Sequence, residues 1–362
     1  MNFPRHLIAL LACIFTMAAC DKNIGSEDDD KDQPDNVLPT IYAKGADISW
    51  LTQMEEDGQR FYNSEGTEKE CIELMKELGF NSIRLRVWVN PEDGWCSKED
   101  VLEKASRAYN LGMKLMIDFH YSDTWADPGN QNPPEAWKSF TATEMATALA
   151  EHTSDILRSM KNVGIDVEWV QIGNEVNSGM LHPLGKVEGN SAADFVEFLN
   201  TGYKSVKEIY PEAKVILHVS NGHDAGLFDW FFSLMKKYNA EYDIIGMSLY
   251  PVWWENGGWN DWAGPVNSCI SNIKTLVEKF GKSVMICETG FPVSEAQMAK
   301  QALRHIINET CKIDGFLGVF YWEPQTDGVW KPAYYNSLGW KAYDKGAFKD
   351  GKATIALDPF KN

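Results

Sequence analysis

Two glutamates close apolar runs of the chain, where an acidic side chain needs a chemical reason. Glu175 ends the run that begins at Trp169, and Glu288 follows the run that begins at Val284. Strands buried on both faces normally stay apolar, and a structural ion-pair network is the plain alternative for both. Two carboxyl groups across one cleft can instead hydrolyse a glycosidic bond. The spacing therefore favours a pair in which one carboxyl donates a proton and the other attacks a sugar carbon.

The surroundings of each carboxyl must determine which one stays protonated and which one is ionised. A base such as Arg86 near Glu288 would keep that carboxyl ionised, whereas an apolar setting would raise the pKa of Glu175. Tyr250 lies between the two glutamates in the sequence and could donate a hydrogen bond to the nucleophile. We expect Glu175 to be the acid/base and Glu288 to be the nucleophile.

A repeating pattern of short β-rich runs and longer helical stretches must position these groups. Eight such runs occur, and periodic apolar residues between them predict helices over 68–78, 98–111, 142–163, 192–209, 227–238, 266–280 and 295–309. This alternation predicts an α/β fold, a (β/α)8 TIM barrel forming a single catalytic domain over 37–362. Chemistry in this fold gathers at the carboxyl ends of the strands. The predicted strands cover 45–49, 82–88, 114–120, 169–175, 215–220, 244–250, 284–289 and 318–324.

Several local motifs narrow the class of enzyme. The segments 45–49, 83–91, 118–129, 171–181 and 321–324 together resemble glycoside hydrolase family 53, in order along the chain. That family contains endo-β-1,4-galactanases, which cut the galactan side chains of pectin. The resemblance implies a retaining double displacement on β-1,4-galactan, with Glu175 as acid/base and Glu288 as nucleophile. Alternatives are another β-1,4-glycanase of the same clan, acting on mannan or glucan, and a non-catalytic surface glycan-binding lipoprotein.

The resemblance also implies the residues that would hold the sugar. Asn174 would bind the sugar 2-hydroxyl, and Trp322 would form the aromatic floor of the subsite. For His120 the alternative is a core histidine that pairs with Asp118. Tryptophans near strand ends, such as Trp50, could provide further stacking faces or simply pack the loops. The expected substrate-binding residues are Asp47, Arg86, His120, Asp123, Trp125, Asn174, His223, Tyr250 and Trp322, with Asp127 on the same loops.

Neither a cofactor nor a bound metal is expected. Some bacterial members of the family have a structural calcium in long loops after strands seven and eight. Here residues 289–294 lead directly into a helix and offer no ladder of oxygen ligands, so we predict no such calcium. Five cysteines follow the first twenty residues, an odd number that rules out a complete disulfide framework but leaves one or two bridges open.

The N-terminal segment predicts export. Residues 1–19 have a basic start and a short apolar run, typical of a signal peptide, and the small residues before Cys20 resemble a lipobox in which that cysteine is lipidated. Residues 20–36 form an acidic tether, so we expect a surface-exposed outer-membrane lipoprotein that touches the membrane only through its lipid. The formal net charge of -18 disfavours a nucleic-acid partner. The expected partner is a polysaccharide, and the expected state is a monomer.

Overall fold

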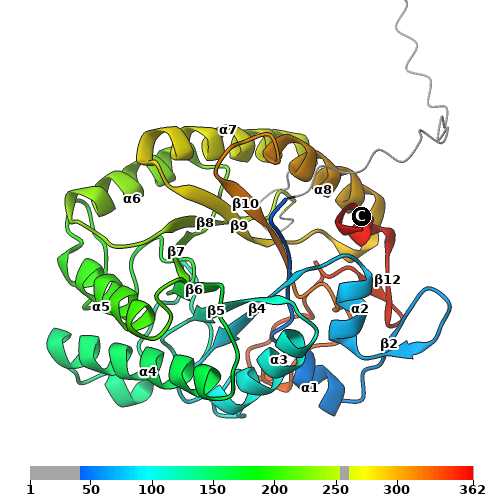
Figure 1. Ribbon diagram of the computed structural model, residues 1–362, viewed down its shortest axis with the longest axis horizontal. Coiled ribbons are helices and arrows are strands. Elements are labelled where there is room, and N and C mark those ends of the chain that lie inside the picture. Colours follow the sequence, from blue (N-terminus) through cyan, green and yellow to red (C-terminus); the bar gives the residue numbers. More distant parts are fainter. Residues whose placement is uncertain (1–40, 253–260, 362) are drawn as a thin grey trace, which may run out of the picture. The chain divides into compact units, whose positions relative to one another are not determined.

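Eight parallel strands close into a barrel with helices around its outside (Figure 1). The computed structural model describes residues 41–252 and 261–361. The order around the barrel is β1-β10-β9-β8-β7-β6-β5-β4, so the prediction of a (β/α)8 barrel is confirmed. The barrel strands are β1 (Ala43–Asp47), β4 (Ser82–Val87), β5 (Lys114–Phe119), β6 (Trp169–Ile172), β7 (Lys214–Val219), β8 (Ile244–Leu249), β9 (Ser283–Thr289) and β10 (Phe316–Trp322).

The predicted helices form close to their expected bounds because each has an apolar face, and some also have a capping residue at their start. Thr141 makes a capping box with Glu144 at the start of α4, and Ser97 accepts from the Asp100 amide at the start of α3. Their apolar faces pack against the outward side chains of the strands. The helices are α1 (Leu51–Glu56), α2 (Cys71–Glu77), α3 (Lys98–Asn110), α4 (Ala142–Asn162), α5 (Ala193–Ile209), α6 (Ala225–Lys237), α7 (Ala263–Phe280), α8 (Ala296–Thr310) and α9 (Ala333–Ser337).

The barrel interior changes character along its axis. An apolar plug fills its amino-terminal half, and a layer of buried polar side chains lies above it. Because side chains alternate along a strand, the two layers come from the same inward-facing rows. The plug consists of Ala43, Met116, Trp169, Ile216, Ile244, Met285, Cys287 and Phe320. The polar layer contains Asp47, Arg84, Asp118, Gln171, His218, Ser248 and Glu288.

An irregularity in β9 aims Glu288 into the barrel. Met285 and Cys287 both belong to the interior plug, so strict alternation would turn Glu288 outward. The register shifts there against both neighbouring strands, and Ser248 of β8 pairs with Glu288 of β9. An extra residue in one strand re-aims the side chains that follow it. The bulge therefore places Glu288 beside Ser248.

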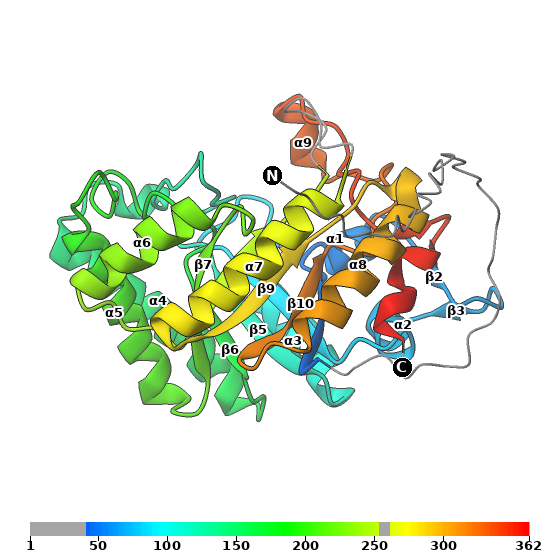
Figure 2. The same ribbon diagram turned by 90° about the horizontal axis from the view of Figure 1, so that it is seen from above.

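Some elements outside the barrel were not predicted. A small sheet of order β11-β12-β2-β3 joins residues before α2 to residues near the C-terminus. After β10 the chain makes a long excursion that carries α9, which stands off the barrel in the side view (Figure 2). The strands are β2 (Phe61–Tyr62), β3 (Glu68–Lys69), β11 (Phe348–Lys349) and β12 (Lys352–Ala353), and the 3-10 turns are Glu135–Trp137, Val293–Glu295 and Ile355–Phe360.

Two features of the described residues concern the expectations for an exported protein: the state of its cysteines and the length and hydropathy of its helices. Within 41–252 and 261–361 all five cysteines are free thiols, and four of them are buried. No helix in those ranges is both long and apolar enough to cross a bilayer. Cys20 and the predicted signal peptide and tether lie outside the described residues.

Candidate active site

A cavity of about 600 Å³ opens at the carboxyl ends of the barrel strands. It contains both predicted glutamates, together with aromatic side chains from the loops after β5 and β10. Its lining is His120, Trp125, Ala126, Asp127, Pro128, Asn174, Glu175, Ser220, Asn221, His223, Ser248, Tyr250, Glu288, Trp322, Tyr335, Trp340 and Tyr343.

Glu175 is presented by a sharp turn just after β6. Gly173 has φ 81° and Glu175 itself has φ 46°, a left-handed conformation that is uncommon for a residue with a Cβ. The Glu175 amide donates to His218 Nδ1 at 3.4 Å, and the next amide, of Val176, donates to the His218 carbonyl at 2.9 Å. Neighbouring strand β7 thus holds the turn that aims the carboxyl at the cavity.

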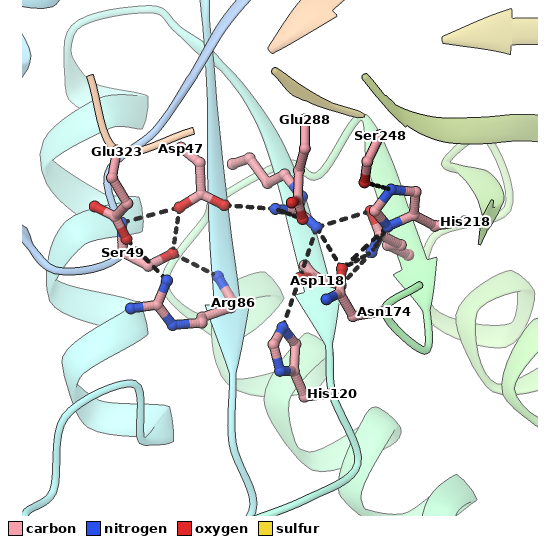
Figure 3. A network of polar contacts seen from close by, with 12 residues as sticks. Asp47, Ser49, Arg86, Asp118, His120, Asn174, His218, Ser248, Glu288 and Glu323 are labelled. Carbon is pink, nitrogen blue, oxygen red and sulfur yellow. Dashed lines mark hydrogen bonds and ion pairs between the residues drawn. The ribbon is translucent and has the colours of Figure 1, made fainter. Parts of the chain in front are cut away.

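A serine and a histidine support the Glu175 carboxyl. Ser248 Oγ donates to Glu175 Oε1 at 2.5 Å, and His218 Nε2 lies 2.9 Å from the same hydroxyl. Burial lowers the pKa of His218 well below its usual range, so the ring is neutral. Because its Nδ1 accepts from the Glu175 amide, we assign the ring proton to Nε2, which then donates to Ser248 (Figure 3).

Glu288 has stronger donors around it. Arg84 Nη1 lies 2.8 Å from Oε1, and the Tyr250 hydroxyl donates to Oε2 at 3.1 Å. The prediction that Tyr250 bonds the second glutamate is confirmed. The prediction that Arg86 supplies the positive charge there is wrong, because Arg86 Nη1 instead pairs with Glu323 at 2.8 Å. Arg84 and Arg86 both point inward from β4, and the deeper one reaches Glu288.

Burial affects both carboxyls. It raises the pKa of both Glu175 and Glu288, and the charge of Glu175 raises the pKa of Glu288 further while Arg84 lowers it. Near neutral pH the pair therefore retains a proton. The contacts place it: a guanidinium and a phenol favour a carboxylate at Glu288, whereas within 41–252 and 261–361 the Glu175 carboxyl accepts from the Ser248 hydroxyl alone. The pair is thus polarised into one acid and one nucleophile.

Arg84 connects the polar layer. Its guanidinium donates to Asp47 at 2.7 Å and to Asp118 at 2.8 Å, in addition to its contact with Glu288. It also donates to the side-chain oxygen of Asn174 at 2.9 Å. Although burial alone would raise the pKa of Asp118, Arg84 and His120 hold it below its usual range. One buried cation thus fixes three carboxylates and the amide beside Glu175.

Comparisons with known proteins agree with this geometry. The model of Glycosyl hydrolase family 53 matches residues 43–360. The chain belongs to this family. An arabinogalactan endo-beta-1,4-galactanase from Humicola insolens is 31% identical over 88% of this chain and 98% of its own length. An endo-beta-1,4-galactanase from Bacillus subtilis is 29% identical over 84% of this chain and 75% of its own.

Solved structures of similar proteins agree with the assignment to family 53. A fungal beta-1,4-galactanase superposes with a TM-score of 0.77 and 29% identity, covering 89% of this chain and 99% of that one. The GH53 catalytic domain from Ignisphaera aggregans also gives a TM-score of 0.77, at 27% identity, over 91% of this chain and 98% of that one. The family 53 chain is therefore a glycoside hydrolase, and the expected resemblance is confirmed.

Most of the predicted site residues of this family 53 protein line the cavity. His120 lines it as well as pairing with Asp118, since Nε2 lies 3.1 Å from that carboxylate. The His120 Nδ1 accepts from the Ala126 amide at 3.0 Å, so both ring nitrogens are engaged within the protein. The predicted residues in the lining are Glu175, Glu288, His120, Trp125, Asn174, His223, Tyr250 and Trp322, with Asp127.

Three predicted binding residues lie outside the lining. Asp47 is fully buried and accepts from Arg84 and Ser49. Asp123 accepts from the amides of Asn90 and Glu135, at 2.9 and 2.8 Å, and so braces the loop after β5. Arg86 is held under the cavity by Glu323. Asp47 and Asp123 support the site from behind because their carboxylates already accept hydrogen bonds within the protein, whereas Nε and Nη2 of Arg86 have no hydrogen-bond partner among the described residues.

Sequence reasoning missed several residues that shape the site. Three of them lie in the inward-facing rows of the strands, two residues before a predicted site residue or before a predicted strand end: Arg84, His218 and Ser248. The alternation of side chains along a strand was the signal that could have found them. Tyr335, Trp340 and Tyr343 come from the excursion after β10, which has no periodic pattern.

Of the other tryptophans near strand ends, Trp262 is half-buried and its ring centroid lies 5.7 Å from that of His305. Trp50 is a buried hub whose ring meets those of Trp125 and Trp322 at 5.8 and 5.1 Å, so it packs the loops and does not face the cavity. Trp253, Trp254 and Trp259 lie outside the described residues.

Within 41–252 and 261–361 no three acidic, histidine or cysteine side chains are arranged to hold a metal ion. The expectation that the protein has no structural calcium stays a prediction.

Proposed function

We propose that this family 53 protein is an endo-acting hydrolase of β-1,4-galactan that works with retention of configuration. One observation carries the proposal: two glutamates face one cavity, and the donors around Glu288, a guanidinium and a phenol, stabilise a carboxylate more strongly than the Ser248 hydroxyl does at Glu175. The names of the Humicola insolens and Bacillus subtilis relatives support galactan as the substrate. The side chains of pectin, galactan and arabinogalactan, are the polysaccharides we expect it to bind.

In the first step the ionised Glu288 attacks the anomeric carbon. The bond to the leaving oxygen breaks as Glu175 gives that oxygen its proton, which leaves a glycosyl ester on Glu288. In the second step Glu175 takes a proton from water, and the water oxygen displaces Glu288 from the same carbon. This route requires carboxyls about 5–5.5 Å apart.

The supporting residues act at defined atoms. Asn174 is fixed by Arg84 on its oxygen and by the Ala126 carbonyl on its nitrogen, 2.8 Å away. That nitrogen carries a second hydrogen, which in this proposal donates to the sugar 2-hydroxyl. Trp322 and Trp125 offer indole surfaces to the pyranose rings. The Tyr250 hydroxyl stays protonated, since burial raises its pKa well above the usual range, and so remains a donor to Glu288.

Substrate preference is tested by release of reducing ends from purified linear galactan, mannan and cellulose. We expect rapid release from galactan and little from the other two, with intermediate-length products that indicate endo cleavage. Glu288→Gln and Glu175→Gln are the matched controls, and each should abolish release. Preference for mannan or glucan would favour another β-1,4-glycanase, and binding to galactan without cleavage would favour a non-catalytic lipoprotein.

We also propose that the protein is exported and held by a lipid on Cys20 at the outer membrane. The support is the sequence of residues 1–36, with its short apolar run, lipobox-like end and acidic tether. Labelling with a fatty-acid analogue should mark the wild-type protein and not Cys20→Ala. Protease added to intact cells should remove surface-exposed protein, and a protected protein would place it on the inner face.

A further inference from the structure

Arg86 is a buried cation that the double displacement does not use. It is 1% exposed, its Nη1 pairs with Glu323 Oε1 at 2.8 Å, and it is absent from the cavity lining. Figure 3 shows Arg86 with Glu323 and Ser49, on the other side of the network from His218. A buried charge is costly to keep, so its place in this fold calls for an explanation.

Four indoles surround this guanidinium. Its Cζ lies 4.2 Å from the Trp125 ring centroid and 6.0 Å from that of Trp322. The rings of Trp50 and Trp88 are 5.2 and 5.5 Å away. Desolvated cation–π contacts at such distances are attractive. Trp125 and Trp322 also line the cavity, so the cation touches the back of its aromatic wall.

Trp125 is the member of this wall that most needs such support. It comes from the irregular loop after β5, and its ring is only partly buried. Its indole nitrogen donates to Tyr334 at 2.9 Å, which fixes one edge of the ring. Arg86 stacks on one face, so only the opposite face and the free edge can meet a sugar. Glu323 in turn holds the guanidinium in place.

We propose that Arg86 is a positioning residue for substrate binding, which sets the Trp125 indole as a sugar-stacking surface. The inference rests on the proposed function, because it assumes a pyranose in the cavity. It assigns Arg86 a role through Trp125, in place of the direct sugar contact expected from the sequence. Loss of the planar guanidinium should therefore weaken binding and leave the bond-breaking step unchanged.

The test variant is Arg86→Lys, which keeps the charge and the pairing with Glu323 but removes the flat stacking face. On linear galactan we expect KM to rise about tenfold with kcat within twofold. Trp125→Phe lacks the indole nitrogen and Trp125→Ala lacks the ring. In the double variant Arg86→Lys/Trp125→Ala, KM should be no worse than in Trp125→Ala alone. Additive losses, or a fall in kcat at unchanged KM, would overturn the proposal.

A second measurement needs no substrate. The indole N–H signal of Trp125 in a ¹⁵N NMR spectrum is identified by its absence in Trp125→Phe, and it should move or broaden in Arg86→Lys. An unchanged signal overturns the positioning role, whatever the activity. A wild-type protein without galactan hydrolysis would instead contradict the proposed function alone. If Arg86→Lys does not fold, Arg86→Gln/Glu323→Gln removes both buried charges together and takes the same two measurements.

Discussion

Removing the Ser248 hydroxyl should raise the pH at which the enzyme loses activity. The hydroxyl donates to Glu175 Oε1 at 2.5 Å and so stabilises the carboxylate over the acid. Without it, the carboxylate is less favoured and the pKa of Glu175 rises further above about 7. Because the proposed mechanism needs a protonated Glu175, Ser248→Ala should keep this residue competent to higher pH.

The size of the shift follows from the strength of the lost bond. A hydrogen bond to a charged group contributes about 1.5–3 kcal/mol, and one pKa unit corresponds to about 1.4 kcal/mol. The basic limb of kcat/KM should therefore move up by about one to two units. The variant also leaves the Nε2 hydrogen of His218 without its acceptor, which should cost about 1–3 kcal/mol of stability.

The assay is kcat/KM on galactan from pH 4 to about 10, with thermal melting at each pH to exclude unfolding. Ser248→Thr keeps a hydroxyl and should retain the wild-type limb. Ser220→Ala removes a hydroxyl that lines the same cavity but contacts Asn177, so it should shift nothing. A basic limb that stays in place or moves down in Ser248→Ala would refute the assignment of Glu175 as the proton donor.

Two further perturbations follow from the buried charges. Glu175→Gln should stabilise the folded protein at pH 8 but not at pH 4.5. Burial raises the pKa of Glu175 from 4.5 to about 7 in the folded protein. The contribution of this carboxyl to the free energy of unfolding is therefore complete below its unfolded pKa and is lost as the pH rises through its folded pKa. The difference in unfolding free energy should be on the order of 2–3 kcal/mol by urea denaturation, and a variant less stable at pH 8 would contradict it. Arg84→Lys should lower kcat about a hundredfold and move the acidic limb up, because Arg84 opposes the raised pKa of Glu288. Arg107→Lys, in an outer cluster with Glu55 and Glu70, is the control that should leave activity intact.

The sequence was sufficient to predict the barrel because its signals are local and repeated. Each amphipathic helix and each apolar strand has its own periodicity, so errors at one boundary do not spread. The positions of Glu175 and Glu288 followed from the rule that chemistry gathers at strand ends. Boundaries moved by up to three residues: α2 begins at Cys71 where the prediction began at residue 68, and β1 begins at Ala43 where it began at residue 45.

The partners of the glutamates were harder to predict because they depend on depth and register. Arg84 and Arg86 share one face of β4, and their depth in the folded barrel determines which of them reaches Glu288. Alternation alone would turn Glu288 out of the barrel, and the bulge in β9 that corrects this has no sequence signature. Tyr343 and Trp340 arrive through tertiary contacts of an irregular segment.

The most direct test of the central proposal is the anomer first released from linear β-1,4-galactan, followed by ¹H NMR. Glu288 attacks one face of the anomeric carbon and water then attacks the opposite face, so two inversions predict the β-anomer first, before mutarotation mixes it with the α-anomer. Initial release of the α-anomer would contradict the double displacement, and an unchanged spectrum would contradict hydrolysis of galactan.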